Sequence, residues 1–102
     1  MPLHRWNRDE LGPPSEAAMR ALFESLGYRC SVYVYPPGTV FPEHTHGVDK
    51  LDGVVSGRFR ITLEGEEILL GSGDWVEVPR GVVHRAEVVG AEPVVSVDAI
   101  RD

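Results

Sequence analysis

The chain has 102 residues, 42% of them hydrophobic and 25% charged, which is the composition of one small globular domain and is too apolar for a disordered chain. Sixteen acidic and ten dispersed basic residues give a formal net charge of −6, which argues against a nucleic-acid partner. No apolar run approaches the roughly 18–20 residues that a bilayer requires, and residues 1–10 contain no apolar signal-peptide core. We therefore expect a cytoplasmic protein without a membrane span. Because so short a domain has a small core, we also expect a homodimer.

Residues 1–27 are expected to form an N-terminal arm and one short helix that packs on the rest of the chain. Ser15 is a favourable N-cap, and Gly27 is a favourable helix end. Residues 1–11 are either an arm that lies across the domain, anchored by Trp6, or a frayed end. The apolar residues of the helix recur at helical spacing, as Ala18, Leu22 and Leu26, with Met19 and Phe23 beside them.

Residues 28–102 consist of short β-branched and aromatic runs separated by turn signals such as Pro36-Pro37-Gly38. Apolar and polar residues alternate within these runs, which gives each strand one dry face and one wetter face. About eight short strands joined by tight turns favour a closed jelly-roll barrel, because closure removes exposed sheet edges. The sequence therefore predicts an all-β domain with the arm and helix outside it.

Three histidines fall where the strand pattern indicates their direction. Alternate residues of a strand share a face, so His44-Thr45-His46 presents two imidazoles about 6.5–7 Å apart at the backbone, close enough to share one metal ion. Val40 has the same parity, which places both imidazoles on the expected inner face. His84 lies on the apolar face of residues 82–88 and therefore also points inward, where a metal is one way to satisfy its ring nitrogens.

The glycines and prolines around these histidines resemble the two sequence motifs of the cupin family, in its small single-domain, cupin-2 type. Gly38 precedes His44 by six residues, and Gly57 closes the first segment. The second motif, G-x5-P-x-G-x2-H, is formed by Gly73, Pro79, Gly81 and His84. The resemblance implies a double-stranded β-helix, the cupin barrel, with one divalent transition metal held by His44, His46 and His84. Zinc, iron, nickel, copper and manganese are the candidate metals.

The chain departs from the cupin pattern at two places. Val88 stands where the pattern has an asparagine four residues after the last histidine, and Lys50 and Leu51 stand where it has a glutamate three or four residues after the histidine pair. If Ser56-Gly57 is a two-residue hairpin turn, Lys50 faces Leu63 and points into the barrel together with Asp52. A three-residue loop would instead turn Leu51 inside. We favour the first register, which makes Lys50 and Asp52 candidate catalytic residues near the metal.

Lys50 has three possible roles in such a site. It pairs with Asp52, or it handles a proton or an anionic group of the ligand, or it abolishes metal binding. Burial and a nearby cation would both lower the pKa of its ammonium group.

The motifs leave three functions open: a metal-dependent enzyme acting on a small, anionic molecule, a ligand-binding module without turnover, and a metal-free scaffold. The enzyme is the favoured hypothesis. Cys30 is expected to be a buried small apolar residue. The aromatic residues either pack against the helix, the arm or a partner subunit, or line the mouth of the barrel; they are Tyr33, Tyr35, Phe41 and Trp75.

Overall fold

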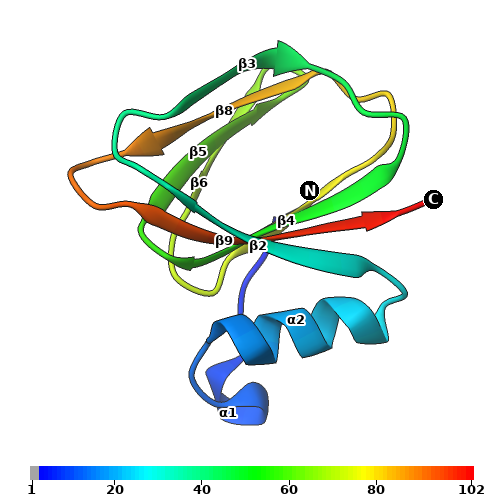
Figure 1. Ribbon diagram of the computed structural model, residues 1–102, viewed down its shortest axis with the longest axis vertical. Helices are drawn as coiled ribbons and strands as arrows, with labels where there is room; N and C mark the ends of the chain where they lie inside the picture. The colour runs from blue at the N-terminus through cyan, green and yellow to red at the C-terminus, as the bar shows by residue number, and fades with distance from the viewer. Residues whose placement is uncertain (1–2) are drawn as a thin grey trace.

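The structure, a computed structural model, describes residues 3–102 as two facing antiparallel sheets with two helices beneath one of them (Figure 1). One sheet has the strand order β1-β7-β4-β9-β2, and the other has the order β3-β8-β5-β6. This arrangement confirms the predicted all-β jelly roll. The strands are β1 (Leu3–His4), β2 (Arg29–Tyr35), β3 (Val40–His44), β4 (Asp49–Ser56), β5 (Arg58–Leu63), β6 (Glu66–Leu70), β7 (Trp75–Val78), β8 (His84–Val89) and β9 (Val94–Arg101).

The main hydrophobic core fills the space between the two sheets. On β5, Phe59, Ile61 and Leu63 are buried, while the residues between them lie on the outer face, as the alternation predicts. Fully burying one such side chain stabilises the fold by about 1.5–3 kcal/mol. The buried members of this core are Val54, Phe59, Ile61, Leu63, Ile68, Leu70, Val76, Val78, Ala86, Val88 and Val94.

A second core lies between helix α2 (Glu16–Ser25) and the outer face of the five-stranded sheet. Ser15 caps the helix as predicted, because its hydroxyl oxygen accepts a hydrogen bond from the backbone N–H of Ala18. Met19 and Phe23 are 0% exposed and form the buried row of the helix. The predicted apolar row was wrong in part, since Leu26 is exposed and Ala18 is only partly buried.

Gly53 of β4 allows α2 to approach the sheet this closely. A Cβ atom at Gly53 would lie 2.8 Å from Cζ of Phe23 and would also overlap the Met19 side chain. The helix therefore sits in a hollow that a glycine leaves in the sheet surface.

The N-terminal arm lies across the domain, which settles the alternative that the sequence left open for residues 3–11. β1 pairs with β7, and the Arg5 guanidinium lies 2.7 Å from the carboxylate of Asp74. Trp6 donates a hydrogen bond to the Gly12 carbonyl at 2.8 Å. Met1 and Pro2 lie outside the described residues.

The arm also contains a one-turn helix, α1 (Arg8–Leu11), which the expectation of a single helix missed. The Asn7 side chain caps it by accepting hydrogen bonds from two backbone N–H groups, a local interaction that the apolar pattern does not reveal. Neither helix of the described chain has the length and apolarity needed to cross a membrane.

The predicted hairpin between β4 and β5 was wrong. β4 pairs with β7 and β9, whereas β5 pairs with β6 and β8, so the turn at Ser56-Gly57 carries the chain from one sheet to the other. Lys50 therefore does not face Leu63 in a ladder. Both faces of β4 are covered, one by α2 and the other by the facing sheet, and this decides the direction of its side chains: Leu51 faces the helix and Val54 faces the barrel.

Candidate metal centre

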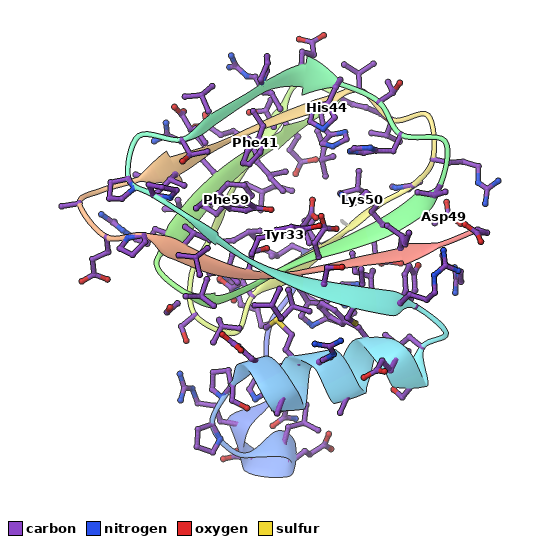
Figure 2. All side chains as sticks on the ribbon, viewed as in Figure 1. Tyr33, Phe41, His44, Asp49, Lys50 and Phe59 are labelled. Carbon is purple, nitrogen blue, oxygen red and sulfur yellow. The ribbon has the colours of Figure 1, made fainter. Side chains whose placement is uncertain are left out.

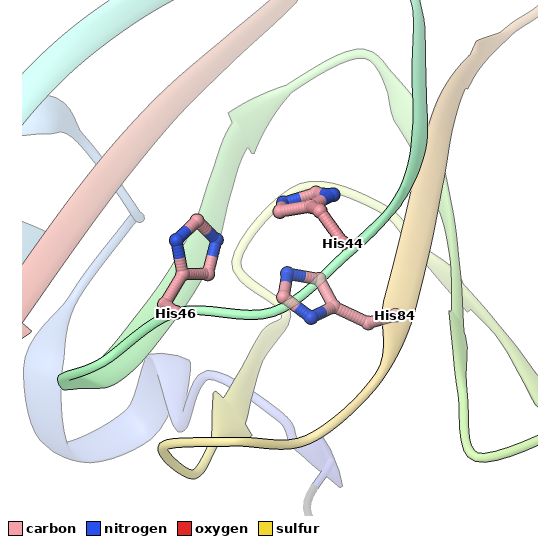
Figure 3. A group of neighbouring side chains, drawn as sticks. All are labelled: His44, His46 and His84. Carbon is pink, nitrogen blue, oxygen red and sulfur yellow. The ribbon is translucent and has the colours of Figure 1, made fainter.

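Three histidine side chains meet between the two sheets (Figure 3). His44 is the last residue of β3, His46 follows in the connection to β4, and His84 begins β8 directly opposite His44. One potential ligand nitrogen from each ring lies within 4.8 Å of the other two. The ring centroids are 4.2 Å apart for His44 and His84, and 4.6 Å apart for His44 and His46. Three neutral imidazoles grouped in this way could hold one divalent transition metal.

A β-bulge in β3 turns His44 inward. Phe41 pairs with Ala86 and His44 pairs with His84, so three steps along β3 oppose two steps along β8. Phe41 and His44 therefore both face the interior. Val40 is 62% exposed and faces outward, so the parity argument that linked it to the histidines was wrong. The extra residue of the bulge reverses the alternation between Val40 and His44.

Two of the histidines are held in the tautomer that a metal ligand requires. Nδ1 of His44 donates a hydrogen bond to the Pro42 carbonyl at 2.6 Å, and Nδ1 of His84 donates one to the Val82 carbonyl at 3.0 Å. A carbonyl oxygen only accepts, so the proton of each neutral ring is on Nδ1 and the lone pair is on Nε2. Burial lowers the pKa of His46 and of His84, and the Lys50 ammonium adds to the effect at both residues. The neutral form is the one that binds a metal.

An ionic group lines the same pocket and consists of Lys50 and Asp52 from β4 and Asp98 from β9. Lys50 Nζ donates a hydrogen bond to Oδ2 of Asp98 at 3.0 Å and lies 3.9 Å from Oδ1 of Asp52. Asp52 and Asp98 are direct partners across the β4–β9 ladder. The side chains are only 12% (Lys50), 16% (Asp52) and 19% (Asp98) exposed. Lys50 and Asp52 thus point inward, although not through the pairing from which we expected this.

The two carboxylates change the ionisation expected for Lys50. Burial by itself would lower the pKa of Lys50, but the charges of Asp52 and Asp98 outweigh it and raise the pKa above its usual value. The expected lowering included the charge of a bound metal, and it stays a prediction for the metal-bound protein. Burial, followed by the charge of Asp98, raises the pKa of Asp52 to about 6. The pocket thus contains a stable ammonium group and a carboxyl group that titrates near neutral pH.

The pocket between the sheets has a volume of about 150 Å³. Aromatic rings form part of its wall: the ring centroids of Tyr35 and Phe41 are 4.8 Å apart, and those of Tyr35 and Phe59 are 5.7 Å apart. Burial and then the charge of Asp98 raise the pKa of Tyr35 to about 12, so its phenol keeps its proton. The lining residues are Tyr35, Phe41, His44, His46, Lys50, Asp52, Phe59, His84, Ala86, Ser96 and Asp98.

Asp98 and Ser96 are pocket residues that the sequence analysis missed. On β9 they share the inward face with Val94, while Val97 and Ala99 face α2. The available signal was the alternation itself, because a serine and an aspartate at alternate positions of an otherwise apolar strand indicate a polar interior surface.

The remaining residues singled out in the sequence lie elsewhere. His4, on the arm, stacks on Trp75 of β7 with the ring centroids 3.9 Å apart, and its Nε2 lies 2.7 Å from the carboxylate of Glu77 on the same strand. Cys30 is partly buried under α2, and burial raises the pKa of its thiol. A larger hollow of about 300 Å³, lined in part by Arg60 and Glu87, contains none of the three clustered histidines.

A jelly-roll barrel with three inward histidines from two motifs defines a class of proteins, and comparison with known families gives the same class. Residues 31–100 match the family described as "Cupin domain". Because the match covers most of the chain, the chain belongs to the cupin family.

Individual relatives agree with this assignment. The chain is 43% identical over 49 residues to quercetin 2,3-dioxygenase of Bacillus subtilis (strain 168), a match that covers 46% of this chain and only 14% of that enzyme. It resembles the structure of KdgF from Halomonas sp. with a TM-score of 0.64 and 28% identity, over 74% of this chain and 71% of that chain. A cupin protein from Bacteroides fragilis gives a TM-score of 0.63 and 26% identity, over 78% and 71% of the two chains.

Proposed function

We propose that the protein is a metal-dependent enzyme that acts on a small, anionic molecule, with one divalent transition metal held by His44, His46 and His84. The observation that carries the proposal is the convergence of three ring nitrogens within 4.8 Å, two of them freed by Nδ1 hydrogen bonds. A metal with three protein ligands has coordination positions left for a substrate. When bound, it would supply Lewis-acid or redox chemistry at those positions.

Lys50 and Asp52 are the proposed catalytic residues of this chain. The Lys50 ammonium stays protonated, so it donates hydrogen bonds and positive charge to an anionic group of the substrate. The Asp52 carboxyl, with a pKa of about 6, takes or gives a proton near neutral pH. Asp98 holds Lys50 in place through its hydrogen bond.

The similarity to quercetin 2,3-dioxygenase supports an enzyme, although it covers only part of each chain. The alternative of a ligand-binding module without turnover is favoured by one observation: the Lys50 ammonium already pairs with two carboxylates. An assay for conversion of a bound ligand to product distinguishes the enzyme from the ligand-binding module.

The metal centre is tested by elemental analysis of protein purified without a histidine tag. We expect about one divalent transition metal per wild-type chain. The His84→Ala variant should lose most of it, while His4→Ala, which removes a histidine outside the cluster, should retain it. A wild-type protein that binds no added metal, or equal metal content in wild type and His84→Ala, would contradict the proposal.

A further inference from the structure

The pocket has two chemically different sides. Figure 2 shows Phe41 and Phe59 together on one side, with His44 and Lys50 on the other. The imidazoles and the ionic group offer positive charge and hydrogen bonds. Apart from the phenol of Tyr35, the aromatic rings offer only apolar surface, and neither the metal centre nor the proposed proton transfer uses them.

The pocket reaches Ala86 on its aromatic side, where the small side chain leaves a gap between larger neighbours. Ala86 lies opposite Phe41 in the β3–β8 ladder and opposite Ile61 in the β5–β8 ladder. A methyl group between two large side chains on one face of a sheet leaves space above it. Phe41 and Phe59 also line the pocket, and their rings pack on each other with centroids 6.1 Å apart in an edge-to-face arrangement. The gap is bounded by side chains that favour a flat or branched hydrocarbon group.

The size of the pocket limits that group. Its volume is about 150 Å³, whereas pockets for drug-sized ligands are typically about 300–1,000 Å³. An apolar cavity of about 150 Å³ holds one benzene molecule. This pocket must hold the head group of the ligand in the same volume, so a ligand can bury at most about one ring here, and the further rings of a larger molecule would remain outside.

We infer that the site takes a compact carboxylate whose apolar part is no larger than one six-membered ring, with the ring against Phe41, Phe59 and Ala86 and the carboxylate toward the histidines and Lys50. This inference rests on the proposed function, because the metal supplies the positive charge that draws the carboxylate. Acetate has the head group without the ring, and a three-ring flavonol exceeds the pocket.

The test is calorimetric titration of metal-loaded protein with benzoate, acetate and quercetin. Burial of a ring should make benzoate bind about 10- to 100-fold more tightly than acetate. Quercetin should bind no more tightly than benzoate. Equal affinities for benzoate and acetate, or a clear preference for quercetin, would overturn the inference.

Two variants locate the ring. Ala86→Leu fills the gap and should weaken benzoate binding at least tenfold, while leaving acetate affinity unchanged. Phe41→Ala removes one wall and should act in the same direction. Val40→Ala is the matched control, because Val40 is the neighbouring residue and faces outward. Unchanged benzoate affinity in Phe41→Ala, measured against Val40→Ala, contradicts the inference even if Ala86→Leu does not fold.

Results that reject the inference can be distinguished from results that reject the proposed function. Metal content is measured in each sample: bound metal with no preference for benzoate over acetate rejects the inference alone. If the chain binds no metal, the proposed function fails, and benzyl alcohol becomes the probe of the aromatic side. Binding of benzyl alcohol that Ala86→Leu removes supports the ring site, and no binding rejects it.

Discussion

Lys50, Asp52 and Asp98 place one positive and up to two negative charges in a poorly hydrated pocket. Removing such groups from water costs several kcal/mol for each ion, and ion pairing offsets this cost only when every partner is present. The raised pKa of Asp52 reduces the cost, since a protonated carboxyl group leaves one ammonium paired with one carboxylate. Near neutral pH the group therefore has two charge states of similar free energy, and a ligand or metal can shift the balance between them.

Replacing Lys50 with methionine tests its role in the site. Lys50→Met should bind metal more tightly, because the repulsion of the ammonium is gone, and should bind an anionic ligand more weakly. Its free energy of unfolding should also fall by about 2–4 kcal/mol, because Asp52 and Asp98 lose their cation. Metal titration, benzoate titration and urea denaturation measure the three effects.

Two further variants complete this test. Lys50→Glu should add a fourth metal ligand. Arg80→Met is the control, because Arg80 pairs with Asp49 at the exposed surface and should change little. If Lys50→Met leaves metal affinity, ligand binding and stability all unchanged, Lys50 has no role in the site.

The raised pKa of Asp52 makes stability depend on pH in a defined direction. Its folded-state pKa is about 6, against an ordinary value of 3.8, so the folded state binds the proton more tightly than the unfolded state. The resulting stabilisation is complete below about pH 3.8 and is lost as the pH rises through about 6. The metal-free Asp52→Asn variant does not lose this stabilisation. Its free energy of unfolding, relative to that of wild type, should therefore rise by about 1–2 kcal/mol between pH 4 and pH 7.

Denaturation at a series of pH values in the presence of a chelator measures this difference. Asp49→Asn is the control with the opposite sign. The hydrogen bond from the Arg80 backbone N–H lowers the pKa of Asp49. The stabilisation that the ionised Asp49 carboxylate gives the fold is therefore lost as the pH falls. A difference between wild type and Asp52→Asn that does not change with pH would show that Asp52 ionises normally.

At the level of secondary structure, the fit of α2 on β4 depends on a single missing side chain. Gly53→Ala should destabilise the fold by about 1–3 kcal/mol, because the added methyl group overlaps Met19 and Phe23. Thermal unfolding measures the loss. Gly65→Ser is a control for substitution of a glycine, since space is open around Gly65 and only its positive φ adds strain. Equal stability of wild type and Gly53→Ala would show that the helix shifts at no cost.

The elements also show where alternation along a strand predicts direction and where it does not. For β5 and β9 the period of two holds over the whole strand, so Phe59 and Asp98 face the side that alternation indicates. For β3 one bulged residue breaks the period, and the sequence signal at that place is Pro42, because a proline within a strand is confined to edges and bulges. For β4 the pairing partners come from β7 and β9, which are remote in sequence, and a short turn does not reveal them. The two cupin-like motifs thus predicted the histidine cluster, but the complete ionic group, with Asp98, required the sheet topology.

For the whole molecule, the expected homodimer stays a prediction. β2 is an edge strand of the five-stranded sheet, and Val34 on it is 61% exposed. An open edge with apolar side chains favours pairing with a second copy. Light scattering should give twice the chain mass, and Val34→Lys should shift the protein toward monomer. A monomeric wild type at high micromolar concentration would contradict the prediction.

The strand order has a consequence for how the chain is made. β9 lies between β4 and β2, so a strand late in the described chain joins two strands that are made much earlier. Until residues 94–101 have left the ribosome, β2 and β4 lack their shared neighbour, Val97 and Ala99 are missing beneath α2, and Asp98 is not available to Lys50. The nascent chain therefore exposes apolar strands until β9 emerges, and this sheet closes only through contacts distant in sequence.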